Sequence, residues 1–243
     1  MSHHIVEVQG LGYCYPDGTE ALQDVSFRIH HGESVAVVGA NGAGKSTLLL
    51  HLNGCLVPFA GHVRIGDYPL TRETLQQVRR TVGMVFQDPD DQLFLPTVYD
   101  DVAFGPLNLG LPQDEVDARV QQSLASVNCE HLRGRPPYKL SGGEKRSVAI
   151  ASVLAMSPDI LVFDEPTSNL DPRARRKLIC LLQGFKHTKI IATHDLDMVM
   201  DTCERTIVMH QGKVFADEAT LEIFNNDELL QQCHLERPLS LSR

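Results

Sequence analysis

Short, uninterrupted apolar runs recur along the chain and divide it into segments. Four of them have the length of core strands: residues 34–38, 82–86, 159–163 and 189–192. The run at 34–38 ends in a glycine, as expected of a strand that is buried on both faces of a sheet. A helix is predicted between the last two strands, over 172–185. Strands that alternate with helices indicate an α/β core.

Further strand patterns lie nearer the two ends of the chain. Residues 5–8 and 25–29 are predicted strands, and Pro16-Asp17-Gly18 forms a turn between them. Residues 205–209 and 213–216 flank His210-Gln211-Gly212, a sequence typical of a hairpin. The residues after Asn226 are mostly polar, so we expect a frayed, polar C-terminal tail over 226–243.

The segment 88–157 differs from the rest because its sequence favours helices. One helix is predicted over 113–127 and another over 143–156. The apolar positions that recur at helical spacing in the first of them are Val116, Val120, Leu124 and Val127. We therefore predict one domain, in which a helical lobe (88–157) is inserted into a core formed by residues 1–87 and 158–225.

Composition excludes several classes of protein. The chain has 243 residues, of which 42% are hydrophobic and 22% charged, as in an ordinary globular domain. Its formal net charge of −9 argues against a nucleic-acid partner, which would favour a basic face. The six cysteines form no C-x-x-C pair, which indicates reduced thiols and no zinc site. No apolar run is long enough to span a bilayer, so a membrane role requires a partner.

Residues 39–47 match the pattern G-x-x-x-x-G-K-[ST] of a phosphate-binding loop, with a strand before it and a helix after it. The glycines allow the backbone to wrap a β-phosphate, and Lys45 neutralises β- and γ-phosphate oxygens. The Ser46 hydroxyl is suited to bind Mg²⁺. The nucleotide-binding residues predicted here are Gly39, Asn41, Gly42, Ala43, Gly44, Lys45, Ser46 and Thr47.

Two acids follow the apolar run at 159–163. Asp164 is expected to hold the shell of a Mg²⁺ ion, usually through water. Glu165 is then placed to polarise an attacking water as a general base. The alternative is that both acids only cap the turn at Pro166. The phosphate loop in the same chain favours the magnesium interpretation.

Gln87 and His194 each follow a predicted core strand. A neutral amide can ligate Mg²⁺ and orient water, so Gln87 is suited to sense a γ-phosphate and to transmit its state to the helical lobe. An imidazole at His194 is suited to contact the γ-phosphate and to position the water. A lone histidine after a strand is more often structural. Together with Lys45 and Glu165, these two residues complete the predicted catalytic set.

Leu140-Ser141-Gly142-Gly143-Glu144 is a glycine-rich loop that opens a predicted helix. The free N–H groups and the positive dipole end at such a helix start suit a terminal phosphate. The chain already has a complete phosphate loop at 39–47. Two phosphate-binding loops in one chain are explained if two copies meet head to tail, so that the loop at 140–144 closes on the other copy's nucleotide.

In their order along the chain, these motifs resemble those of ABC-type ATPases. The resemblance covers residues 1–225 and rests on Tyr15, Gly39 to Thr47, Gln87, Leu140 to Glu144, Asp164-Glu165, Asp171 and His194. It implies a P-loop NTPase (RecA-like) α/β core with an antiparallel β subdomain and an inserted α-helical subdomain. It also implies ATP and Mg²⁺ as cofactors, and ATP hydrolysis coupled to transmembrane transport.

The resemblance also assigns two residues outside the main motifs. It implies that Tyr15 stacks on adenine, with Tyr13 as the neighbouring candidate, although either ring could pack into the first sheet. It implies that residues 168–171 cross a dimer interface, although Asp171 equally suits the N-cap of the helix at 172–185. No motif position is degraded. A homodimer with two competent sites is therefore compatible with the sequence, as is a dimer with a paralogous ATPase.

The stretch from Asp88 to Pro106 is similar to ATPases of energy-coupling factor importers, and within them the cobalt-type ATPase subunit is the nearest match. Such importers take up cobalt, nickel or vitamins through a transmembrane coupling subunit and a substrate-binding membrane subunit. The resemblance implies attachment to the cytoplasmic face of the membrane. Asp88, Asp90 and Asp91 could then pair with arginines of the coupling subunit, or only cap and solvate a loop.

Two other functions are less well supported. A soluble ABC ATPase that acts on DNA or ribosomes generally needs a long coiled-coil insertion, a second cassette or a basic face, and this acidic chain has none of these. A small-molecule kinase built on a phosphate loop would leave 140–144 without a purpose.

Overall fold

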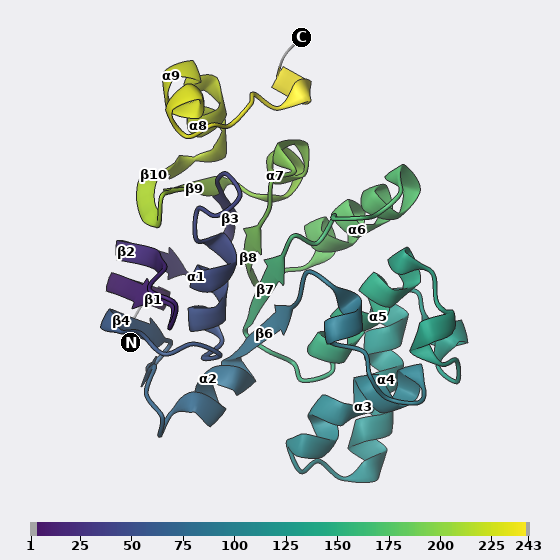
Figure 1. Ribbon diagram of the computed structural model, residues 1–243. Coiled ribbons are helices and arrows are strands. Elements are labelled where there is room, and N and C mark those ends of the chain that lie inside the picture. The colour runs from purple at the N-terminus through teal and green to yellow at the C-terminus, as the bar shows by residue number, and fades with distance from the viewer. Residues whose placement is uncertain (1–3, 242–243) are drawn as a thin grey trace.

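The computed structural model describes residues 4–241, and Figure 1 shows that helices cover both faces of a central sheet. The strands of this sheet are β3 (Ser34–Val38), β6 (Val82–Val85), β7 (Ile160–Asp164), β8 (Thr188–Ala192), β9 (Arg205–His210) and β10 (Lys213–Ala219). Their order is β10-β9-β3-β8-β7-β6. All neighbours run parallel except β10, which forms an antiparallel hairpin with β9. The carboxyl ends of β3, β6, β7 and β8 therefore meet at one edge.

A second, antiparallel sheet lies beside the first. Its strands are β1 (His4–Cys14), β2 (Glu20–His30), β4 (Ala60–Ile65) and β5 (Tyr68–Pro69), in the order β2-β1-β4-β5. The turn between β1 and β2 is closed by the Tyr15 and Thr19 backbones, with the Tyr15 N–H donating over 2.9 Å. Alternate residues of β2 are buried, which joins this sheet to the core around the first helix.

The helices before β6 and after β7 are α1 (Lys45–Leu52), α2 (Leu75–Thr81), α6 (Pro172–Gly184), α7 (Leu196–Thr202), α8 (Thr220–Asn225) and α9 (Asp227–Gln232). Between β6 and β7 the chain forms α3 (Val98–Asn108), α4 (Gln113–Ser126) and α5 (Gly142–Leu154). Four short 3-10 turns complete the described part: η1 (Pro89–Asp91), η2 (Glu130–Leu132), η3 (Pro137–Lys139) and η4 (Leu239–Leu241).

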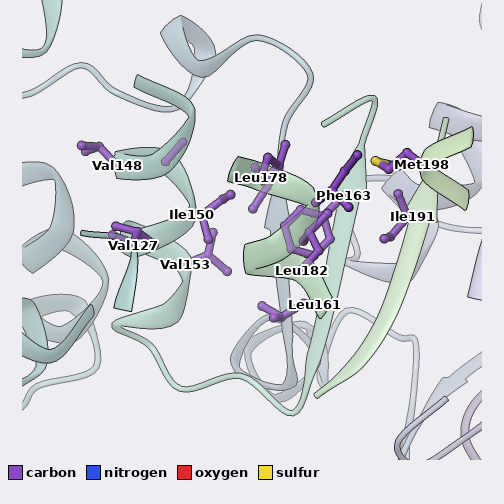
Figure 2. Packing of buried hydrophobic residues seen from close by; sticks show 14 of the residues in the cluster. Val127, Val148, Ile150, Val153, Leu161, Phe163, Leu178, Leu182, Ile191 and Met198 are labelled. Atoms are coloured by element: carbon purple, nitrogen blue, oxygen red, sulfur yellow. The ribbon is translucent and has the colours of Figure 1, made fainter. Parts of the chain in front are cut away.

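The helices between β6 and β7 share a hydrophobic core with the central sheet. In Figure 2, Phe163 of β7 lies against Leu178 and Leu182 of α6, and Ile150 and Val153 of α5 face the same cluster. All five side chains are buried. α5, α6 and the central sheet are thus packed on one another in a single hydrophobic cluster.

The expected fold class is confirmed: an α/β core, an antiparallel β sheet and inserted helices. Residues 226–241 differ from the frayed, polar tail expected over 226–243; residues 242 and 243 lie outside the described residues. Asn226 caps α9 by accepting a hydrogen bond from the Leu229 N–H at 3.0 Å. Leu229, Leu230 and Cys233 are buried. The expectation overlooked that these apolar residues recur at helical spacing in a polar sequence.

Candidate functional site

The phosphate loop connects β3 to α1, and two of its glycines are required by backbone geometry. Gly39 has φ +156°, and a Cβ there would lie 2.3 Å from the carbonyl oxygen of Met209. Gly44 has φ +101°, and a Cβ there would lie 2.7 Å from the carbonyl oxygen of Ala21. A side chain at either position would collide with neighbouring backbone, so the loop can take this shape only with glycine.

A cavity of about 440 Å³ lies against this loop. Its lining comes from the β1–β2 turn, the phosphate loop and the carboxyl ends of the strands: Tyr15, Thr19, Glu20, Ala21, Asn41, Gly42, Ala43, Gly44, Lys45, Ser46, Thr47, Gln87, Glu165 and His194. The fold thus brings together residues that are far apart in sequence. Tyr13, Asp171 and residues 140–144 do not line the cavity.

Lys45 lies at the centre of the loop and is buried. Its Nζ donates to the carbonyl oxygen of Gly39 at 2.8 Å and to that of Ala40 at 3.3 Å. Burial lowers the pKa of Lys45, and the carboxylates of Glu165 and Asp164 oppose this effect. The ammonium group is therefore held inside the loop.

Asp164 ends β7 beside Ser46 and has the chemistry of a magnesium ligand. Its Oδ1 atom is buried and accepts no hydrogen bond from any residue between 4 and 241. Burial raises the pKa of Asp164, and a hydrogen bond with Ser46 opposes this in part. A buried carboxylate oxygen without a donor, next to a hydroxyl, fits a hard cation that prefers oxygen ligands.

Because burial disfavours its ionised form, Asp164 costs stability in the nucleotide-free protein. The folded-state pKa is raised, so the cost is full above that pKa and vanishes below the unfolded value of 3.8. Asp164→Asn is therefore expected to raise the melting temperature at pH 7, because the amide carries no charge that burial disfavours. At pH 3 the gain should disappear. Calorimetry at both pH values checks this, and equal melting temperatures at pH 7 would contradict it.

Glu165 has an unusual backbone and a well-defined side chain. Its φ of +43° is strained for a residue other than glycine, and its N–H donates to the Ala192 carbonyl at 2.8 Å. Its Oε2 accepts from the Thr193 hydroxyl at 3.1 Å and from the His194 N–H at 3.2 Å. The Nδ1 of His194 lies 2.8 Å from the same oxygen. The end of β8 thus orients a carboxylate, as a general base requires.

Tyr15 fits the cavity better than Tyr13 as the aromatic partner of a base. The Tyr15 hydroxyl lies 3.0 Å from the Thr47 Oγ1. Tyr13 packs edge-on against Tyr15, with ring centroids 5.1 Å apart, and against buried His51, at 4.8 Å. Tyr13 therefore lies behind Tyr15, away from the cavity. The supporting role of His51 was not predicted.

The loop at 140–144 begins α5, as expected, but it does not line the cavity at the phosphate loop. Ser141 and Glu144 form a capping box: the Ser141 N–H and hydroxyl each donate to the Glu144 carboxylate at 2.8 Å. Ser141 and Gly142 are exposed. Asp171 caps α6, accepting from the N–H groups of residues 173 and 174 at 2.8 Å. The capping role considered for Asp171 is confirmed.

The loop after β6 is bound to α5 by residues that the sequence reasoning missed. Arg146 donates to the carbonyl oxygens of Phe86 and Gln87, at 2.7 and 2.6 Å. Gln92 donates to the Ala149 carbonyl at 2.8 Å. The sequence offered one indication of this role: Arg146 is a charged residue on the otherwise apolar face of the predicted helix 143–156.

Of the three acids at η1, the N-cap Asp88 and Asp90 have partners within the chain. The Asp88 carboxylate caps η1, accepting from the Asp90 N–H at 2.9 Å. Asp90 forms an ion pair with Lys145 at 2.6 Å. Asp91 is exposed. Phe94 and Phe104 are also exposed nearby and pack edge to face, with ring centroids 5.5 Å apart.

Comparison with known proteins identifies the family of this chain. The family model described as "ABC transporter" matches residues 22–168. A putative ABC transporter ATP-binding protein of Geobacter sulfurreducens is 72% identical over 99% of this chain and 97% of its own length. An energy-coupling factor transporter ATP-binding protein of Methanocaldococcus jannaschii is 47% identical over 97% of this chain and 86% of its own length.

Solved structures give the same result. CbiO1 of Clostridium perfringens, part of the ABC transporter complex CbiONQ, has a TM-score of 0.84 at 41% identity and covers 95% of this chain and 94% of its own. A dimeric ATP-binding cassette bound to ADP and Pi has a TM-score of 0.80 at 30% identity, covering 88% and 98%. This chain belongs to the ABC transporter family, as an ATP-binding and ATP-hydrolysing subunit of the energy-coupling factor type.

Proposed function

We propose that two copies of this chain form a head-to-tail dimer in which each ATP is bound between the phosphate loop of one copy and residues 141–144 of the other. The observation that carries this proposal is that the start of α5 is exposed and lies outside its own chain's phosphate cavity. A helix start with free N–H groups suits a terminal phosphate. One related cassette is dimeric in two solved structures, aligned at 29% and 30% identity, which supports the proposal. A paralogous ATPase in place of one copy would use the same geometry.

The residues around the cavity take distinct roles in this proposal. Tyr15 stacks on the base, and the phosphate loop with Lys45 holds the phosphates. Ser46, Gln87 and Asp164 hold Mg²⁺, which when bound neutralises charge on the β- and γ-phosphates. Glu165 takes the proton of the attacking water. The second copy contributes Ser141, Gly142, Gly143 and Glu144, and Asp171 lies at the interface.

His194 completes this arrangement. Its exposed ring faces the cavity while its Nδ1 lies against the Glu165 carboxylate. It can therefore contact the γ-phosphate and hold the water in line with Glu165. Without this contact, the Glu165 carboxylate would keep its other two donors but lose its link to the phosphate.

We further propose that closure of the dimer moves the helical lobe, residues 88–157, and that this motion acts on a membrane partner. Phe94 and Phe104, with the acids of η1, form an exposed surface of mixed apolar and acidic character on this lobe. Such a surface suits amphipathic, basic helices of a transmembrane coupling subunit. None of the helices in residues 4–241 is both long and apolar enough to cross a membrane. We place the chain at the cytoplasmic face of the membrane, bound to a coupling subunit and a substrate-binding membrane subunit.

For the transported solute we propose a transition metal ion, cobalt or nickel, with a vitamin or another solute as the alternative. A soluble ABC ATPase outside transport is the less favoured function. Co-expression with candidate membrane subunits should give a complex that retains the chain, and ATP-dependent uptake of radioactive cobalt or nickel. Uptake of a vitamin instead would overturn the metal assignment. Failure to co-purify with any coupling subunit would overturn the transport role.

A further inference from the structure

Arg146 is a buried charge that the proposed reaction leaves without a role. It lies in the first turns of α5, two residues after the loop at 140–144, and is 3% exposed. Its Nη1 and Nη2 atoms donate to two successive backbone carbonyls, those of Phe86 and Gln87. Charge-assisted hydrogen bonds of this kind are stronger and more directional than neutral ones.

The loop that Arg146 holds is the one that places Gln87 at the cavity. At its other end, Gln92 accepts from the Phe86 N–H at 3.3 Å and donates to Ala149 and Ser152 of α5, at 2.8 and 2.9 Å. The segment from Phe86 to Gln92 is thus attached to one face of α5 at both ends. The side chain of Gln87 is left free to line the cavity.

The surroundings of Arg146 connect it to the reaction centre. Burial lowers the pKa of Arg146, while the carboxylates of Asp88 and Asp164 raise it. These two acids offset part of the cost of burying the Arg146 charge. A guanidinium can bind two carbonyls in a fixed plane, which a lysine cannot reproduce.

We infer that Arg146 is a positioning residue: it fixes the Gln87 amide at the nucleotide and joins it rigidly to the start of α5, so that Gln87 and the loop at 140–144 move as one piece. The inference rests on the proposed function, because it requires Gln87 to act on the nucleotide-bound metal. It adds that an arginine outside the cavity determines how Gln87 is presented.

A double-mutant cycle tests this inference. Arg146→Met is expected to lower ATP turnover about 10- to 100-fold, the range usual for residues that orient a ligand of a metal. The Mg²⁺ concentration for half-maximal turnover should rise, and ATP affinity without Mg²⁺ should stay unchanged. Gln87→Ala should have a similar effect, and the double variant should be no worse than either single one, since both remove the same interaction.

The matched control is Arg119→Met. Arg119 donates to the Ala155 carbonyl, at the other end of the same helix, at 3.4 Å. Arg119→Met should leave the Mg²⁺ dependence of ATP turnover unchanged. If Arg146→Met does not fold, Arg146→Lys retains the charge and one donor, and should show a smaller loss that again does not multiply with that of Gln87→Ala.

Two results would overturn the inference and are distinguishable. If Gln87→Ala turns over at the wild-type rate, the proposed role of Gln87 is wrong and the inference fails with it. If Gln87→Ala is impaired but its loss multiplies with that of Arg146→Met, the proposed function stands and only the inference is wrong.

Discussion

Glu165→Gln is expected to bind ATP and Mg²⁺ normally and to hydrolyse ATP at least about a hundredfold more slowly, since a positioned general base typically contributes that much or more. The amide oxygen can still accept from the Thr193 hydroxyl and the His194 N–H, which hold Oε2 at 3.1 and 3.2 Å. The backbone at φ +43° is unaffected by the change. The variant therefore loses the proton acceptor and keeps the shape of the site.

Steady-state phosphate release gives the rate, and nucleotide titration gives the affinity. Because product formation no longer opens the dimer, the variant should also accumulate as a closed, ATP-bound pair. Glu115→Gln, which changes a surface carboxylate paired with Arg119 at 2.8 Å, is the matched control and should turn over normally. Rapid hydrolysis by Glu165→Gln would eliminate Glu165 as the base.

Ser141→Arg is expected to abolish most ATP turnover while the single copy still binds nucleotide. A long cationic side chain at the start of α5 would occupy the space proposed for the other copy's γ-phosphate. Ser141 does not line its own chain's cavity, so the phosphate loop should be unaffected. We expect at least a hundredfold loss of turnover, comparable to removal of a donor to the reacting group, and a nearly unchanged affinity for ATP.

The change also removes the N-cap of α5, which costs about 0.5–2 kcal/mol. Thr97→Ala removes the corresponding cap of α3, whose Asp100 N–H donates to Thr97 at 3.2 Å, and measures the cost of a lost cap alone. Its turnover should remain close to that of the wild type. Loss of ATP binding by the single copy of Ser141→Arg would argue against a site shared between two copies.

The elements with an uninterrupted pattern were predictable from the sequence. The strands expected at 34–38, 82–86, 159–163 and 189–192 correspond to β3, β6, β7 and β8, each within one residue at either end. These strands are buried on both faces, so composition alone identifies them. The order in which β3 lies between β8 and β9 was not predictable, because pairing depends on contacts across more than a hundred residues.

Weaker patterns gave partial or wrong predictions. The strand predicted over residues 5–8 extends over His4–Cys14, because pairing with β2 and β4 continues past its apolar part. β4 begins with exposed Ala60-Gly61-His62 and was not predicted. The prediction of a frayed tail was wrong for residues 226–241, because three apolar residues pack this segment against the core. A prediction from overall polarity does not detect them.

Sequence motifs identify the residues of the candidate site well. They identify poorly the residues that hold those site residues in place. The glycines, Lys45 and the acids of β7 have a spacing fixed by the phosphates, so the spacing reveals them. Arg146 and His51 act through a backbone carbonyl or a ring face. Neither contact imposes a fixed spacing in sequence, so only the folded arrangement shows it.

The most direct test of the shared reaction centre compares ATP turnover with oligomeric state. ATP turnover per molecule and molecular mass are measured on the same samples, from nanomolar to micromolar protein. If each reaction centre needs two copies, turnover per molecule should rise with protein concentration. It should level off at the concentrations at which the measured mass is that of a dimer. A constant turnover down to concentrations at which the active protein has the mass of a single chain would contradict the account.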